Sequence, residues 1–117
     1  MHEFGIAQEL VKTVLAELKK LDDSAKLTCV KVVIGKLQEI VPENLTFAYE
    51  SLTEDTRIKG SKLEIVDIPV TVKCNACGWE GEVVGIAFLC GKCESHDVRV
   101  VKGMELYLDK LEVEVDE

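Results

Sequence analysis

The sequence has no apolar segment long enough to cross a membrane. Its longest uninterrupted run of apolar or glycine residues, from Val83 to Cys90, has eight members, whereas a membrane-spanning helix needs about 20. The opening segment Met-His-Glu-Phe-Gly has neither the basic region nor the apolar run of a secretory signal. We therefore expect a cytoplasmic protein without a membrane partner.

Basic residues are scarce, and the familiar catalytic motifs are missing. Fourteen Lys and Arg residues stand against 22 Asp and Glu residues, which gives a net charge of −8. Such a surface repels phosphate backbones, so we expect no nucleic-acid partner. The sequence contains no phosphate-binding G-x-x-x-x-G-K-[ST] loop, no G-x-S-x-G turn and no H-E-x-x-H pair. These absences indicate that the protein is not an enzyme.

The apolar pattern predicts an α+β fold. A length of 117 residues suits one domain, or one core with a small appended module. Apolar residues from Ala7 to Leu21 recur with the spacing of one buried helical face. A strand is predicted over 27–34, with Cys29 as a half-buried thiol on the face opposite Val30, Val32 and Ile34. A second helix is predicted to start at Pro42.

In the second half of the chain, apolar and polar residues alternate, and this pattern predicts two long strands on either side of a cysteine module. Between Leu63 and Val72 the apolar phase slips, which indicates a bulged strand, and Pro69 places it at a sheet edge. Alternation resumes after Gly103. The two strands are natural antiparallel neighbours, so we expect the module at the tip of a long hairpin.

Four of the five cysteines form two Cys-x-x-Cys pairs. Cys74 and Cys77 are separated from Cys90 and Cys93 by the 12 residues 78–89. Two such pairs brought together place four thiolates tetrahedrally, which is the closed arrangement of a structural Zn(II) site. Four thiolates alone do not distinguish zinc from iron, so an iron electron carrier stays open as an alternative.

One of only two histidines occupies position 2. The amine of Met1 together with the backbone nitrogen and imidazole of His2 can form fused chelate rings around one metal, and Glu3 adds an oxygen donor. A flat nitrogen set of this kind favours Ni(II) or Cu(II) over Zn(II). His96, three residues after Cys93, could be a further imidazole ligand. From the residues alone, ordinary exposed positions for both histidines remain an alternative.

These features together resemble the HypA/HybF family of hydrogenase nickel incorporation proteins. The resemblance rests on Met1-His2-Glu3 at the start, an amphipathic helix after it and two Cys-x-x-Cys pairs in the last third. It extends to Ile34-Gly35-Lys36-Leu37 and to Val41-Pro42-Glu43-Asn44-Leu45 followed by Phe47, which are similar to the family's strand end and second helix.

The resemblance implies a nickel metallochaperone that helps to insert Ni(II) into the large subunit of [NiFe]-hydrogenase, together with the GTPase HypB. It implies an α+β nickel-binding domain of two helices on a three-stranded sheet, residues 1–72 and 103–117, with a zinc ribbon inserted at 73–102. His2 would be the principal nickel ligand, with Met1 and Glu3 beside it. The four cysteines would hold zinc.

The sequence departs from the family pattern at two positions. Gly5 stands where the family usually has Ser, which removes a side-chain cap. Glu94 follows Cys93 where the family often has Gly, so the second cysteine turn is expected to differ, and with it the placement of His96.

A zinc-ribbon interaction module without nickel chemistry is the main alternative function. The edge strand and the apolar helix face could also support a homodimer, which the sequence does not decide. If an amine and an imidazole bind the nickel, acidification from about pH 8 to 6 should release it, because both groups must lose protons to bind.

Overall fold

The computed structural model describes residues 2–83 and 88–115, which form two compact units. The first unit comprises the described residues of 1–32, 40–66 and 107–117, and the second comprises those of 33–39 and 67–106. The predicted domain boundaries at 72/73 and 102/103 stay a prediction. No helix in the described part of the chain is long and apolar enough to cross a membrane.

The chain contains two α-helices, one short 3-10 helix and six strands in its described residues. In chain order these are α1 (His2–Leu18), β1 (Lys26–Gly35), η1 (Lys36–Gln38), α2 (Pro42–Thr53), β2 (Lys62–Ile68), β3 (Thr71–Cys74), β4 (Glu80–Glu82), β5 (Val98–Lys102) and β6 (Leu106–Glu114). One three-stranded sheet has the order β2-β1-β6, and the other has the order β4-β3-β5. The predicted α+β class with two helices and a three-stranded sheet is confirmed.

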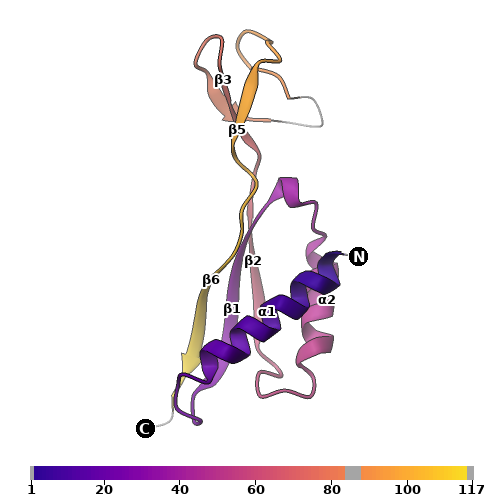
Figure 1. Ribbon diagram of the computed structural model, residues 1–117, viewed down its shortest axis with the longest axis vertical. Coiled ribbons are helices and arrows are strands. Elements are labelled where there is room, and N and C mark those ends of the chain that lie inside the picture. Colours follow the sequence, from indigo (N-terminus) through magenta and orange to yellow (C-terminus); the bar gives the residue numbers. More distant parts are fainter. Residues whose placement is uncertain (1, 84–87, 116–117) are drawn as a thin grey trace. The chain divides into compact units, whose positions relative to one another are not determined.

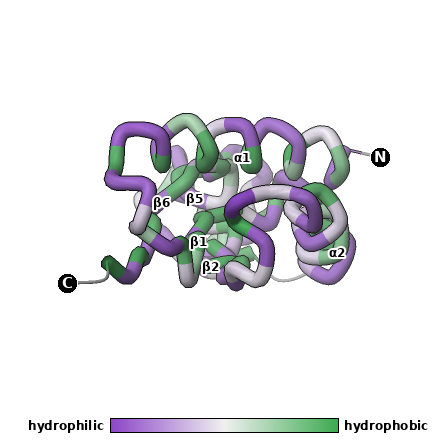
Figure 2. Tube along the Cα trace, turned by 90° about the horizontal axis from the view of Figure 1, so that it is seen from below, coloured by the Kyte–Doolittle hydropathy of each residue, from purple (hydrophilic) through white to green (hydrophobic). Residues whose placement is uncertain are grey.

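In the first unit, α1 and α2 pack against each other on one side of the strands (Figures 1 and 2). The predicted apolar face of α1 is buried at Ala7, Leu10, Val11, Val14 and Leu18. However, the helix begins at His2 rather than Ala7 and ends at Leu18, and Leu21 is 45% exposed. His2, Glu3 and Gly5 therefore belong to the helix instead of preceding it.

The second helix and the first strand follow the sequence pattern. Pro42 opens α2, where its missing N–H removes no helical hydrogen bond. The fully buried Tyr49 places its hydroxyl 2.6 Å from Oγ of Ser61, which satisfies the polar group of an aromatic core residue. Cys29 is half-buried on β1, as predicted.

The prediction of one bulged strand over 63–72 is wrong. The chain instead forms β2 and β3, which belong to different sheets and are separated by Pro69 and Val70. Proline has no N–H to donate to a strand ladder, so β2 ends there. The predicted edge position is confirmed for β2, which lies at one side of β1.

The predicted antiparallel pairing of the strands before and after the cysteine module occurs in only one of the two sheets. In the second unit, β3 and β5 are antiparallel, with Val72 opposite Val100 and Cys74 opposite Val98. In the other sheet, β1 lies between β2 and β6, so these two strands are not neighbours. The alternation in the sequence gave no sign that β1 would pair on both sides.

Candidate metal sites

The four predicted zinc ligands lie together in the second unit. The sulfur atoms of Cys74, Cys77, Cys90 and Cys93 are all within 4.8 Å of one another. Sγ of Cys74 is 3.7 Å from Sγ of Cys93, and Sγ of Cys77 is 3.5 Å from Sγ of Cys90. Tetrahedral zinc with bonds of ~2.3 Å separates its sulfur ligands by roughly 3.8 Å. The cluster therefore fits a four-thiolate zinc site.

Two short segments hold these sulfurs, and we call residues 74–79 the first knuckle and residues 90–95 the second knuckle. In each one, the amide of the first cysteine donates to the carbonyl five residues later: Cys74 to Trp79 at 2.7 Å, and Cys90 to Ser95 at 3.0 Å. The residue four positions later donates back to the first cysteine's carbonyl at 3.0 Å, from Gly78 and from Glu94. The knuckles thus repeat one backbone pattern.

This pattern requires a left-handed residue directly after the second cysteine of each pair. Gly78 has φ 81° and Glu94 has φ 62°. Glycine adopts this conformation without steric cost, whereas a residue with a Cβ atom is disfavoured there. The expectation that Glu94 would change the second turn is wrong, because Glu94 adopts the conformation of Gly78 and makes the corresponding hydrogen bond.

Backbone amides also point at the sulfur atoms. The amide of Cys77 donates to Sγ of Cys74 at 3.4 Å, and the amides of Lys92 and Cys93 both donate to Sγ of Cys90 at 3.3 Å. Burial acts to raise the pKa of Cys90, but the amides of Cys93 and Lys92 and the neighbouring thiols lower it to about 6. Such donors stabilise the thiolate, which is the form that binds a metal.

Trp79 lies against the second knuckle although it ends the first. A methyl group placed on Gly91 would lie only 2.6 Å from Cζ2 of the Trp79 ring. The indole ring is half-buried, so it shields backbone that this small unit cannot cover with a core of its own.

The candidate nickel residues of the first unit lie at the start of α1. The side chain of His2 is 55% exposed, and its Nε2 atom is 3.7 Å from Oε2 of Glu3. Glu3 is 7% exposed, and its Oε2 atom accepts a hydrogen bond from the amide of Val41 at 3.2 Å. This hydrogen bond is the largest of the effects that lower the pKa of Glu3, and the neighbouring His2 lowers that pKa further. Met1 lies outside the described residues.

Sequence reasoning missed Val41 because it contributes only its backbone N–H, which leaves no signal in the amino-acid pattern. The structure brings His2 and Glu3 together. His96 lies in the second unit, where it is exposed in the loop between the second knuckle and β5. Its predicted part in nickel binding stays a prediction.

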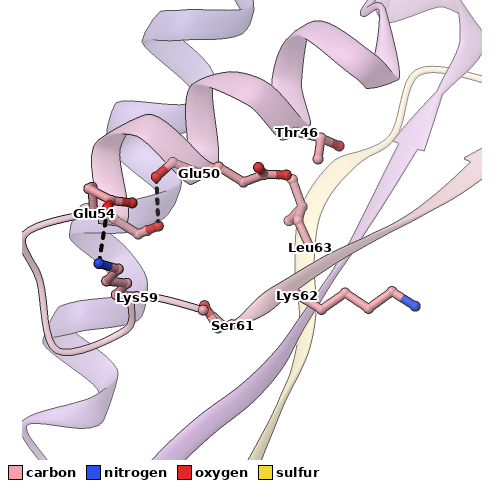
Figure 3. A pocket seen from close by; sticks show the side chains of 9 residues that line it. Thr46, Glu50, Glu54, Lys59, Ser61, Lys62 and Leu63 are labelled. Carbon is pink, nitrogen blue, oxygen red and sulfur yellow. Dashed lines mark hydrogen bonds and ion pairs between the residues drawn. The ribbon is translucent and has the colours of Figure 1, made fainter.

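A pocket of about 520 Å³ opens between α2 and the start of β2 (Figure 3). None of the predicted metal ligands lines it. Its charged side chains have both signs, and Nζ of Lys59 pairs with Oε1 of Glu54 at 3.0 Å. The lining residues are Thr46, Glu50, Thr53, Glu54, Lys59, Gly60, Ser61, Lys62 and Leu63.

The sequence matches a family model described as hydrogenase/urease nickel incorporation, metallochaperone, over residues 1–113. The chain belongs to the HypA family. A hydrogenase maturation factor HypA from Methanocella arvoryzae is 37% identical over 116 residues, covering 98% of this chain and 100% of that protein. The HypA of Desulfosudis oleivorans is 33% identical over 113 residues, covering 97% of this chain and 98% of that one.

Solved HypA structures have the same fold. A solution structure of HypA protein has a TM-score of 0.71 at 27% identity, and the match covers 99% of this chain and 98% of that one. The Ni metallochaperone HypA from Helicobacter pylori has a TM-score of 0.61 at 26% identity, with 97% and 98% covered. HypA is thus a family of maturation factors concerned with nickel incorporation, not of known catalytic enzymes.

Proposed function

We propose that this protein binds Ni(II) at Met1 and His2 and delivers it, with a HypB-type GTPase, to the large subunit of [NiFe]-hydrogenase. The membership of the chain in a nickel-incorporation family supports the cargo and the pathway. The observation that carries the proposed site is the exposed His2 imidazole at the start of α1. Glu3 and His96 are further candidates for the nickel site.

The two candidate sites suit two different roles. The cysteine cluster would hold Zn(II) through all four thiolates, and a closed thiolate set leaves no position for a substrate, so its role is structural. Cys74 and Cys90 are buried at 2% and 1% exposure, whereas Cys77 and Cys93 are exposed, so the complete set of ligands rather than burial closes this metal site. The His2 imidazole is open to solvent instead, and a partner protein can reach a metal bound there.

Nickel binding by untagged, zinc-loaded protein tests this proposal. Equilibrium dialysis with elemental analysis should give one nickel per chain. The His2→Ala variant and a version with two residues added before Met1 should both lose nickel while keeping zinc. Nickel binding that survives both changes would overturn the amino-terminal site, and a chain that binds only zinc would favour an interaction module without nickel chemistry.

His96 is tested in the same series. If it completes the nickel site, His96→Ala should lower nickel affinity without changing zinc content. An unchanged affinity would remove His96 from the ligand set. Acidification should release nickel from the native chain, because protons compete with the metal for its nitrogen ligands.

A further inference from the structure

The carboxylate of Glu3 is engaged with the polypeptide backbone rather than displayed to solvent. Glu3 is 7% exposed, although it lies in the first turn of α1 beside the exposed His2. Its Oε2 atom accepts the Val41 amide at 3.2 Å. Val41 directly precedes α2, so this hydrogen bond joins the starts of the two helices through residues that are 38 positions apart in the sequence.

The same oxygen faces the candidate nickel residue. Oε2 of Glu3 lies 3.7 Å from Nε2 of His2, so the atom that accepts the Val41 amide also contacts the imidazole. If this oxygen moved to a metal, the Val41 amide in this partly buried position would lose its acceptor. Val41 is 44% exposed, so water can take up the freed amide, and the cost of moving the oxygen is that of one charge-assisted hydrogen bond in a partly buried position.

The first turn of α1 needs such support. Helix ends fray, and Gly5 makes this end weaker because glycine loses more conformational freedom in a helix than any other residue. A Cβ atom added at Gly5 would meet nothing within 4 Å, so packing does not explain the glycine. The Glu3 side chain therefore acts as a tether: its hydrogen bond to the Val41 amide holds the first turn of α1, where the helix itself is weakest.

We infer that Glu3 is a positioning residue, whose carboxylate ties the first turn of α1 to the Val41 amide and thereby holds His2 in place for nickel without binding the metal. The nickel part of this inference rests on the proposed function. An ordered first turn lowers the entropic cost of collecting the nitrogen ligands, which is the general benefit of a preorganised site. The tether itself is a property of the metal-free chain.

Two substitutions of Glu3 distinguish a tether to the Val41 amide from a nickel ligand. Glu3→Gln keeps an oxygen that can accept the Val41 amide but removes the carboxylate, whereas Glu3→Ala removes both. We expect Glu3→Gln to bind nickel within about threefold of the native affinity, with the same ligand-field absorption spectrum, and Glu3→Ala to bind at least about tenfold more weakly. Glu9, exposed on the same helix, provides matched Gln and Ala controls that should bind nickel as the native chain does.

Amide hydrogen exchange of the zinc-loaded protein tests the tether without nickel. The Val41 amide should be protected in the native chain and in Glu3→Gln, and should exchange faster in Glu3→Ala.

Adding Gly5→Ala to Glu3→Ala should restore part of the nickel affinity, because it strengthens the same helical turn. Val41→Pro removes the donor instead of the acceptor, and combining it with Glu3→Ala should weaken nickel binding no further than either change alone.

The possible results are distinct. Equal loss of nickel in Glu3→Gln and Glu3→Ala, with a changed spectrum in both, would show that the carboxylate is a ligand and overturn the inference. Nickel affinity and Val41 exchange that are unchanged in Glu3→Ala would overturn it as well. If the native chain binds no nickel, the proposed function fails, but Val41 exchange still decides whether the tether exists.

Discussion

The first and second knuckles of the cysteine cluster are held by the same backbone hydrogen bonds but place different residues at the critical turn. Gly78 takes the left-handed position in the first and Glu94 takes it in the second. The bonds that they make to Cys74 and Cys90 have the same length, 3.0 Å. The comparison teaches that the spacing of the cysteines and the backbone pattern specify the turn, whereas the residue at the left-handed position sets its conformational cost.

The sharpest test of this equivalence is the loss of one ligand from either knuckle. We expect Cys77→Ser and Cys93→Ser to lower zinc affinity by similar factors of at least about a hundredfold, because folding of the module is coupled to metal binding. Competition with a chelating indicator measures the affinity. The helical circular dichroism of α1 and α2 should persist. A loss confined to one variant would show that the knuckles are not equivalent.

A smaller effect should follow from adding a Cβ atom at the glycine of the first knuckle. Gly78→Ala should destabilise the zinc-loaded protein by ~1 kcal/mol, because alanine is disfavoured at φ 81°. Glu94→Ala is the matched control and should change stability little, since Glu94 already carries a Cβ atom in the same conformation. Denaturant unfolding gives both values. Equal destabilisation by the two alanines would contradict the comparison.

The reverse substitution in the second knuckle should be stabilising. Glu94→Gly relieves the left-handed strain but adds freedom to the unfolded chain, so the net gain should be about 0.5 kcal/mol. The same unfolding experiment measures it. A loss of stability would show that the Glu94 side chain contributes an interaction that outweighs its backbone strain.

The smallest effect concerns a side chain present in only one knuckle. Nδ2 of Asn75 donates to Oδ1 of Asp97 at 3.1 Å, and the equivalent position in the second knuckle is Gly91, which has no side chain. Because this bond is exposed, Asn75→Ala should cost no more than about 0.5 kcal/mol in denaturant unfolding. A larger cost would mean that the first knuckle depends on Asp97 far more than its exposure suggests.

The sequence predicted features that depend on spacing along the chain. The four cysteines, the buried face of α1, the start of α2 at Pro42 and the strand through Cys29 were all found in this way. Their physical basis is local, because helical and strand periodicity and the ligand spacing of a zinc site can be read over a few residues.

Features that depend on distant backbone groups could not be predicted. The alternation over 63–72 shows that the segment is extended, but not that Pro69 divides it between two sheets or that β1 separates β2 from β6. The carboxyl group of Glu3 looked like a ligand because an oxygen donor stood beside His2. Its contact with the Val41 amide depends on how α1 packs against α2, and a backbone N–H has no signature in the sequence.

The fifth cysteine, Cys29, differs from the predicted zinc ligand Cys90 in the direction in which its pKa is shifted. Burial raises the pKa of Cys29, and the nearby carboxylates of Glu112 and Glu64 raise it further, whereas that of Cys90 is lowered to about 6. Thiol reagents attack the thiolate, so at neutral pH Cys29 should react slowly. Cys90 has the lower pKa but is only 1% exposed, so a reagent should reach it once loss of zinc has unfolded the cysteine module. A thiol-reactive dye added to the protein would thus report the release of zinc as rapid labelling, with the strand cysteine as a slow internal reference in the same chain.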